Sequence, residues 1–317
     1  MNAHEFRQFL KQVGTLTHRQ RLMLTKALNE PAAVDAVRAV IERRGGPDKP
    51  PDPCPRCGHS HVQRWGMDKG LQRYRCKGCA RTFNVLSGTP LARLRHRDRW
   101  LDYAQSLLAG LSVRKAARAC GVHRTTSFRW RHRFLSQPRE RKDNDFKGIV
   151  EADETYFLES FKGRRSLPRP ARRRGGVAGS RGLSSEPIPV LIVRDRNGAI
   201  TDAVLPNLSK AAIAPVLKPI LSADTLLCTD GAAVYKALAK AQGIAHHPIN
   251  LRAGMRVRQR AFHIQNVNAY GSRLKGWMHR FHGIATHYLP NYLGWRRMLE
   301  KGGESLTPSN CLALALP

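Results

Sequence analysis

Acidic residues are scarce in this chain. Its 317 residues include 23 Asp and Glu against 55 Lys and Arg, which gives a formal net charge of +32. The stretch from Gly231 to Leu299 contains no carboxylate at all. A charge this large repels itself unless a polyanion neutralises it. The balance therefore favours nucleic acid as the partner over a merely soluble basic surface. Binding should depend steeply on salt, because cationic side chains displace counterions from phosphates.

Long hydrophobic runs are also missing. No segment approaches the roughly 20 apolar residues of a membrane-spanning helix. The first residues, Met1 to Lys26, lack the apolar region of a signal peptide. We therefore expect no membrane partner and a cytoplasmic location in association with the nucleoid. The length suffices for two or three domains with buried cores.

Only seven cysteines are present, and four of them form two CxxC pairs. In a reducing compartment, paired thiols indicate metal binding more than disulfides. Four thiolates satisfy a tetrahedral Zn²⁺ ion, and two pairs favour a structural metal site over a redox motif. We predict a zinc ribbon over residues 52–86, held by Cys54, Cys57, Cys76 and Cys79. The other thiols are expected to be core residues: Cys120, Cys228 and Cys311.

Residues 91–142 are strongly basic and carry a helix-turn-helix pattern. Ser112 is suited to cap the first helix, and Gly121 permits the turn. We predict that the second helix, about residues 123–135, packs Phe128 into the core and turns a cationic side toward a DNA groove. The predicted groove-facing side chains are Arg124, Ser127, Arg129 and Arg131. A plain helical hairpin in a basic protein is the alternative.

The two ends of the chain carry no recognisable chemistry. Residues 1–46 are predicted to form an arm of short helices, and Thr17 is predicted to cap the second of them. Residues 45–53 are rich in Pro and Gly and predict a linker. Residues 302–317 predict a short tail that packs on the preceding domain.

Residues 146–301 have the element order of a ribonuclease-H-like α/β domain with a mixed sheet. Three antiparallel strands are followed by helix, strand, helix, strand and helix. The first strand signal runs from Gly148 to Phe157, and a buried run ends on Asp230. Asn197-Gly198 predicts a type I′ hairpin turn, in which both central residues need positive φ. We therefore expect a multidomain α+β protein, with catalysis in this last domain.

Two aspartates and one helix face form the candidate site. Asp153 and Asp230 each end a short apolar run. Asn268 and Lys275 fall within about 60° of each other on a predicted helix, at 100° per residue. Carboxylate and amide oxygens are the ligands that Mg²⁺ takes in proteins. Two strand-end aspartates and a helix amide can therefore form a metal cage, with Glu151 as a second-choice ligand on the face of Asp153.

These motifs resemble zinc-ribbon-containing DDE-type transposases of bacterial insertion sequences, over roughly residues 54–300. The segment from Glu151 to Tyr156, with Asp153 inside it, is similar to the first catalytic motif of that family, and Thr229-Asp230-Gly231 is similar to the second. The third motif usually places Glu a few residues after His, with Lys seven positions further on. Here Asn268 stands in place of Glu, and Lys275 follows, so the chain resembles the subgroup with Asp-Asp-Asn and a following Lys.

The resemblance implies an enzyme that binds element ends and catalyses metal-dependent DNA cleavage and strand transfer. It implies Mg²⁺ or Mn²⁺ held by Asp153, Asp230 and Asn268, with Lys275 on a phosphate, and one structural Zn²⁺. The implied partners are double-stranded DNA, both terminal inverted repeats and target, and further copies of the chain in a homodimer or higher assembly. Because the amide removes one negative charge, two alternatives remain open. One is a transposase-derived DNA-binding regulator with an inactive catalytic domain, and the other is a structure-selective nuclease without strand transfer.

Overall fold

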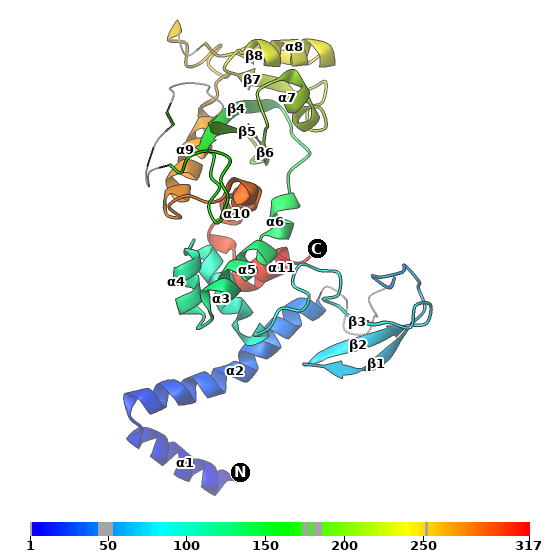
Figure 1. Cartoon of the computed structure of the whole chain (residues 1–317), viewed down its shortest axis with the longest axis vertical. Helices are drawn as coiled ribbons and strands as arrows, with labels where there is room; N and C mark the ends of the chain where they lie inside the picture. Colours follow the sequence, from blue (N-terminus) through cyan, green and yellow to red (C-terminus); the bar gives the residue numbers. More distant parts are fainter. Residues whose placement is uncertain (1, 44–52, 173–175, 177, 180–185, 251–252) are drawn as a thin grey trace. The chain divides into compact units, whose positions relative to one another are not determined.

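The computed structural model describes residues 2–43, 53–172, 176, 178–179, 186–250 and 253–317 (Figure 1). The chain divides into two compact units, each described here by itself. The first comprises Met1–Phe134 with Leu306–Pro317, and the second comprises Leu135–Ser305. The predicted linker, apart from Pro53, lies outside the described residues.

The second unit is built on a five-stranded sheet whose order is β6-β5-β4-β7-β8. Its strands are β4 Ile149–Leu158, β5 Pro187–Asp195, β6 Ile200–Val204, β7 Leu226–Thr229 and β8 Ala245–Pro248. Its helices are α6 Ser136–Glu140, α7 Lys210–Leu217, α8 Ala233–Gln242, α9 Gln265–His279 and α10 Leu289–Gly302, with 3-10 turns η3 Thr286–Tyr288 and η4 Gly303–Ser305. β4, β5 and β6 pair antiparallel, whereas β7 is parallel to β4 and β8 is parallel to β7. The predicted mixed sheet and the predicted order of elements are thus both observed.

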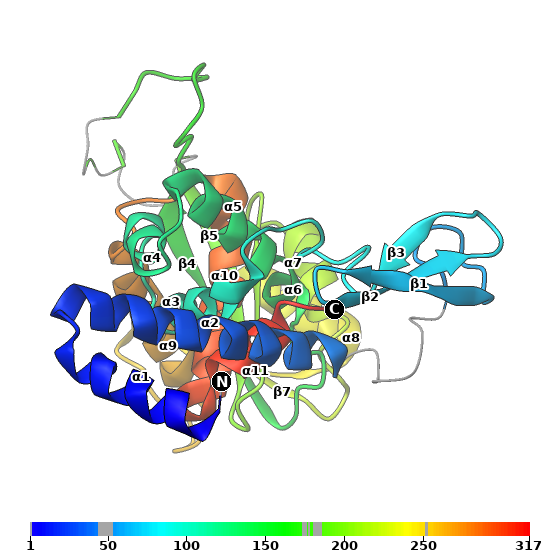
Figure 2. The same cartoon turned by 90° about the horizontal axis from the view of Figure 1, so that it is seen from below.

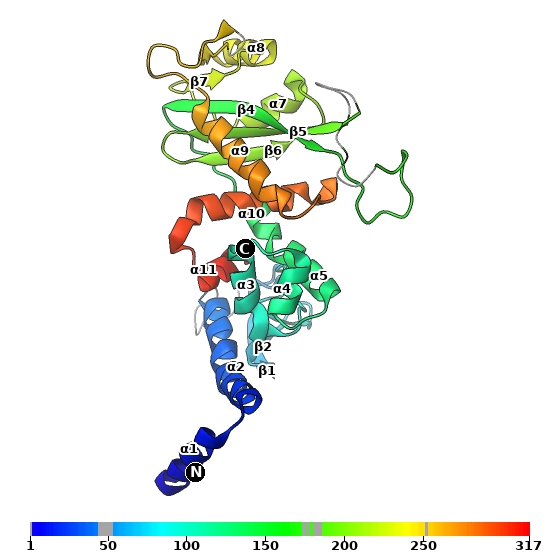
Figure 3. The same cartoon turned by 90° about the vertical axis from the view of Figure 1, so that its left-hand side faces the viewer.

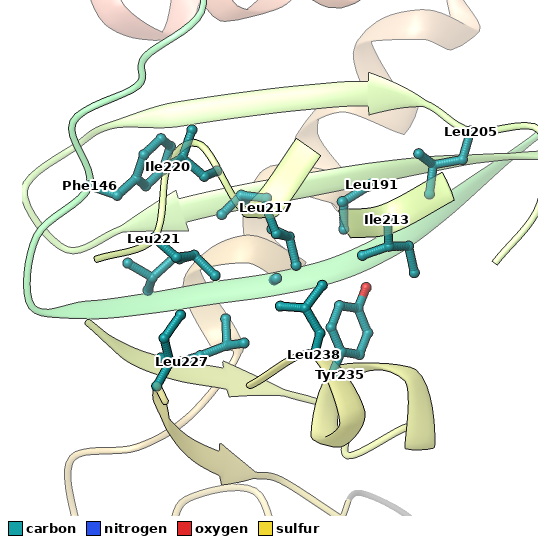
Figure 4. Packing of buried hydrophobic residues seen from close by; sticks show 14 residues of the cluster. Phe146, Leu191, Leu205, Ile213, Leu217, Ile220, Leu221, Leu227, Tyr235 and Leu238 are labelled. Atoms are coloured by element: carbon teal, nitrogen blue, oxygen red, sulfur yellow. The ribbon is translucent and has the colours of Figure 1, made fainter. Parts of the chain in front are cut away.

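The two faces of this sheet are covered by different helices. On one face, α7 and α8 pack over a core that includes Leu191, Leu217 and Tyr235 (Figure 4). On the other face, α9 lies across β4 and β5 (Figure 3). Successive residues of a strand point to opposite faces. Because Ala152 belongs to the core under α7 and α8, its neighbour Asp153 points toward the face that carries α9.

The turn between β5 and β6 differs from the predicted type I′ turn. Gly198 has φ of +100°, but Asn197 is not among the residues with positive φ. The loop is instead held by the buried carboxylate of Asp195, whose Oδ1 accepts hydrogen bonds from the N–H groups of Asn197 at 2.9 Å and Ala199 at 2.8 Å. A side chain that closes the loop in this way removes the need for two residues with positive φ.

A buried arginine joins α10 to the segment before the sheet. Arg297 is 1% exposed and forms an ion pair with Asp202 of β6. Its guanidinium also donates to the carbonyl oxygens of Pro138 at 3.1 Å, Arg139 at 3.0 Å and Arg141 at 3.1 Å. The buried charge of Asp202 is therefore compensated by the buried guanidinium of Arg297.

The first unit contains a helical group and a small sheet. The helices are α1 Ala3–Thr15, α2 His18–Glu42, α3 Trp100–Leu108, α4 Val113–Ala119, α5 Arg124–Phe134 and α11 Pro308–Leu314, with the 3-10 turn η1 Arg97–Arg99. Thr17 caps α2 as predicted, through its hydroxyl and the N–H of Gln20, but α2 is one helix of 25 residues and not the short helix that was expected there. The C-terminal half of α2 buries Val37 and Ile41, and α2 contacts α3 and α11. The last residues form α11, which packs on α3 and groups with this unit. The prediction that the tail packs on the preceding domain is therefore wrong, because the apolar residues of α11 are buried against α2 and α3 instead.

The small sheet consists of β1 Val62–Asp68, β2 Leu71–Cys76 and β3 Thr82–Asn84, side by side and antiparallel (Figure 2). Its core is minimal: Tyr74 packs on Phe83 with ring centroids 5.9 Å apart, and the buried cysteines adjoin them. Among the described residues, no helix is both long enough and apolar enough to cross a membrane.

Candidate functional site

Asp153 and Asp230 come from neighbouring parallel strands. The last paired residues of β4 and β7 are Glu151 and Cys228. Extending this register by two positions brings Asp153 of β4 beside Asp230, which directly follows β7. Adjacent strands lie about 4.8 Å apart, so the pairing places the two carboxylates on the same face, next to each other along the sheet.

Each of these carboxylates uses one oxygen locally. Oδ1 of Asp153 accepts the N–H of Glu154 at 2.9 Å, and Oδ1 of Asp230 accepts the N–H of Ala232 at 3.0 Å. In the contacts of the described residues, each Oδ2 is left for another ligand. Asp153 is half-buried and Asp230 is exposed, so a cation can reach them from solvent.

The carboxylate of Asp153 lies in an environment that disfavours its negative charge. The positive charge near it does not offset the effects of burial and of the neighbouring carboxylates. Burial raises the pKa of Asp153 to about 7, and the carboxylates of Glu154 and Asp230 add to the rise. The N–H of Glu154 and the ammonium of Lys275 act in the opposite direction. A divalent cation would relieve both the burial cost and the repulsion, because it supplies positive charge directly at the oxygens.

Glu154 and Tyr235 are part of this neighbourhood, although sequence reasoning gave them no role. Burial raises the pKa of the Glu154 carboxyl, against the hydrogen bond that the Tyr235 hydroxyl donates to it. The pKa of Tyr235 is raised by burial and by the nearby carboxylates. Glu154 stood in the motif beside Asp153, but nothing in the sequence pointed to Tyr235 of α8, because the two residues are distant in the chain.

Asn268 and Lys275 both lie on α9, the helix that covers the face of Asp153. Asn268 is half-buried and Lys275 is exposed. Lys275 is close enough to Asp153 to lower its pKa. Asn268 makes no side-chain hydrogen bond to either aspartate among the described residues. The three carboxylates of Asp153, Glu154 and Asp230 also do not converge as a ready-made cage, since the described residues form such a group only from cysteines.

Glu151, the second-choice ligand, is otherwise engaged. Its side chain is 0% exposed. One oxygen accepts N–H groups from the first turn of α9, and the other accepts the Asn266 side chain. Both oxygens are thus committed within the protein, which disfavours Glu151 as a metal ligand.

The four cysteines of the small sheet come together at one point. Their sulfur atoms all lie within 4.8 Å of one another. Cys54 Sγ is 3.9 Å from Cys79 Sγ, and Cys57 Sγ is 3.6 Å from Cys76 Sγ. A tetrahedron with Zn–S bonds of about 2.3 Å has sulfurs about 3.8 Å apart. The donor set and its spacing therefore fit a tetrahedral metal ion. As expected, the remaining three thiols are buried.

The helix-turn-helix is formed by α4 and α5, and Ser112 caps α4 as predicted. Gly121 takes φ of +59° in the turn. The core around α5 holds Trp100, Tyr103 and Trp130, each at most 1% exposed. Tyr103 Oη donates to the carbonyl oxygen of Ser127 at 2.6 Å, which ties α5 to α3.

The outward face of α5 matches the predicted one at two of its four residues. Arg124 and Arg129 are exposed as predicted, but Ser127 and Arg131 are buried, both at 0%. Ser127 Oγ donates to the carbonyl oxygen of Val113 at 3.0 Å, and Arg131 Nη2 donates to that of Leu111 at 2.7 Å. The interpretation of Ser127 and Arg131 as groove-facing is therefore wrong for this structure.

Phe128 was also assigned to the wrong face of α5, but in the opposite sense, because it is exposed rather than buried. It was expected in the core, yet it is 42% exposed. The buried positions of α5 follow the i, i+3, i+4, i+7 pattern of one helix face: Ser127, Trp130, Arg131 and Phe134. Because polar residues that bond to backbone carbonyls occupy half of this buried stripe, the sequence pattern alone assigned the helix face incorrectly.

The comparisons with known proteins point to mobile genetic elements. Residues 145–296 match the ISXO2-like transposase domain, and residues 93–139 match a homeodomain-like domain. A protein from Halobacterium salinarum, described as an uncharacterized protein in transposable element ISH50, is 28% identical over 250 residues, covering 76% of this chain and 82% of the relative.

Two solved structures overlap this chain weakly. One is a simian T-cell lymphotropic virus intasome in complex with the PP2A regulatory subunit B56 gamma, with 12% identity, a TM-score of 0.29, and coverage of 62% of this chain and 67% of that chain. The other is a pre-cleavage Mos1 transpososome, with 15% identity, a TM-score of 0.22, and coverage of 63% and 78%.

Proposed function

We propose that this chain, which carries an ISXO2-like transposase domain and a homeodomain-like domain, is an insertion-sequence transposase with an Asp-Asp-Asn site. Its second unit would be the ribonuclease-H-like catalytic domain, in keeping with the strand order and the parallel and antiparallel pairings. The observation that carries the proposal is the placement of Asp153 beside Asp230 on the sheet face covered by α9.

In this proposal Asp153, Asp230 and Asn268 hold divalent metal, Mg²⁺ or Mn²⁺. When bound, such ions lower the pKa of an attacking water or 3′-hydroxyl and stabilise the leaving oxygen. The strand pairing holds the two aspartates in place, and α9 presents the amide. Lys275, exposed on the same helix, binds a DNA phosphate as a point charge. No side chain forms a covalent bond to DNA.

The other modules are proposed to find the DNA. The small sheet and its four cysteines would be a zinc ribbon over residues 52–86, because the sulfur spacing fits Zn²⁺. The outward face of α5, with Arg124 and Arg129, would enter a groove of the terminal inverted repeat. Two ends must be processed together, so a homodimer or higher assembly is expected. The domain limits 1–46, 91–142, 146–301 and 302–317 also stay predictions.

Truncating Arg129 should weaken DNA binding without unfolding the first unit. Arg129→Ala removes an exposed cation, so the slope of log affinity against log salt should fall by about one. Arg131→Met is the matched control, because Arg131 is buried. That variant should lose thermal stability but keep the wild-type salt slope below its Tm. A slope that changes for Arg131→Met and not for Arg129→Ala would reverse the assignment of the DNA-binding face.

The function itself is tested with a labelled duplex that carries the candidate element end, incubated with the full chain and Mg²⁺ or Mn²⁺. We expect specific nicks that leave a 3′-hydroxyl, followed by products joined to target DNA. Asp230→Asn should bind the same duplex and leave it intact. Asn268→Asp should still cleave, because a carboxylate oxygen replaces the amide oxygen and restores a negative charge.

Two other outcomes identify the alternatives. Specific binding by the wild type with no cleavage under any divalent ion would support a DNA-binding regulator. Cleavage without joined products would support a nuclease. Cleavage that survives both Asp153→Asn and Asp230→Asn would refute the proposed site.

A further inference from the structure

Helix α9 begins without a capping residue of its own. Its N-cap residue is Ile264, which provides no side-chain hydrogen bond. The first N–H groups of a helix have no partners within the helix, so a buried start needs acceptors from elsewhere. Glu151 of β4 provides them: its Oε2 accepts the N–H of Asn266 at 2.8 Å and the N–H of Val267 at 3.1 Å. The negative carboxylate also lies at the positive end of the helix dipole.

The second oxygen of Glu151 completes the attachment. Oε1 accepts the side-chain amide of Asn266 at 2.8 Å. The guanidinium of Arg196 forms an ion pair with Oε1, with Nε at 3.5 Å, while His263 Nδ1, 3.3 Å from Oε1, accepts the N–H of Gln265. A fully buried carboxylate is stable only when such donors surround it. Glu151 is therefore held from the strand side, by Arg196, and from the helix side at once.

This attachment joins the two elements that carry the proposed metal ligands. Asp153 lies two residues beyond Glu151 on the same face of β4. Asn268 lies two residues beyond Asn266 on α9. Further along α9, a Cβ placed on Gly271 would be 3.8 Å from Ile192, the β5 partner of Asp153. The start of the helix is thus fixed by Glu151, and its next turn lies against the strand beside Asp153.

We propose that Glu151 is a positioning residue that caps α9 from β4 and thereby sets Asn268 relative to Asp153. This role rests on the proposed function, since it gives the metal site its geometry. Glu151 contacts neither substrate nor metal; it acts through the helix. The carboxylate is required because its two oxygens accept three hydrogen bonds from the start of α9, and the nearly isosteric amide of Gln would turn a donor toward another donor.

The cap is tested by hydrogen exchange on the full chain without metal. Glu151→Gln should speed exchange at the amides of Asn266 and Val267 while the C-terminal part of α9 keeps its protection. Asp202→Asn is the matched control, because it changes another buried carboxylate of the same unit that lies in a separate ion pair. That control should not produce selective loss at the start of α9. Unchanged exchange at Asn266 and Val267 in Glu151→Gln would overturn the cap.

The positioning role is tested by Mn²⁺ binding to the same proteins, with free Mn²⁺ followed by electron paramagnetic resonance. Glu151→Gln should weaken binding by about tenfold or more, the range for outer residues that orient metal ligands. Asn268→Ala, which removes a proposed ligand itself, should weaken binding at least as much. If Glu151 acts through Asn268, the double variant should be no weaker than Asn268→Ala alone. The role would be overturned if the two losses of Mn²⁺ affinity multiply in the double variant, or if Glu151→Gln binds Mn²⁺ as tightly as the wild type. A wild type that binds no Mn²⁺ would refute the metal site itself and the role with it.

Discussion

Asp153→Asn is expected to abolish DNA cleavage and, in the absence of metal, to make the protein more stable above pH 7. The two effects share one cause. Burial and neighbouring carboxylates raise the pKa of Asp153 to about 7 from an ordinary value of 3.8. The folded state then binds more protons than the unfolded state between these two values, so stability falls as the pH rises from about 4 to about 7. Asn carries no charge and removes that cost.

The measurement is thermal unfolding in chelator at pH 4 and at pH 8, alongside cleavage with Mg²⁺. At pH 4 the two proteins should be alike. At pH 8 the variant should melt several degrees higher, since about 1 kcal/mol shifts Tm by about 2–4 °C in a domain of this size. Mg²⁺ should raise the Tm of the wild type and not that of the variant. Cleavage should fall on the order of 10³-fold or more, as when one member of a cooperating catalytic group is lost.

Asp224→Asn is the matched control, because Asp224 is exposed and also lies in the second unit. It should leave both the melting profile and cleavage unchanged. A variant at Asp153 that melts lower than the wild type at pH 8 in chelator would contradict the burial argument. A variant that still cleaves at the wild-type rate would contradict its role as a metal ligand.

Loss of zinc is expected to unfold the small sheet, and it is the second large effect. The cores of β1, β2 and β3 contain little beyond Tyr74, Phe83 and the cysteines themselves. A module of this size cannot bury enough apolar surface to fold alone, so we expect the proposed Zn²⁺ site to supply most of its stability. Cys54→Ser should therefore bring the zinc content from one ion per chain to none. Hydrogen exchange over residues 53–84 should lose its protection.

Cys120→Ser is the control for this experiment. Cys120 is buried and lies 3.6 Å from Ser106 Oγ, away from the four-cysteine cluster. It should keep its zinc and the protection of the small sheet. Chelating the wild type gives an independent test, because protection should be lost and should return when Zn²⁺ is added back. Protection that persists in the chelated wild type would show that the module folds without metal.

The burial pattern of α5 could not be predicted from the sequence. The helix-turn-helix was found because Ser112 and Gly121 act through local backbone geometry, which a short segment determines. The face of α5 that is buried was not predicted correctly, because it depends on which of its side chains have hydrogen-bond acceptors in other parts of the fold. Ser127 and Arg131 are polar, yet the carbonyl oxygens of Val113 and Leu111 satisfy them inside the protein.

The sequence by itself determined what spacing and local pattern control: the two cysteine pairs, the order of strands and helices, and the choice of Asp153 and Asp230 as candidates. These follow from short-range geometry and from the alternation of buried and exposed residues. The expectation that both aspartates stand at strand ends holds for Asp230, which follows β7, and is wrong for Asp153, which lies in the middle of β4. The tertiary structure alone decided that Glu151 caps a helix 115 residues away in the chain and that Tyr235 donates to Glu154. No local sequence pattern indicates such contacts between distant residues. They form only because α8 and α9 pack on opposite faces of the sheet.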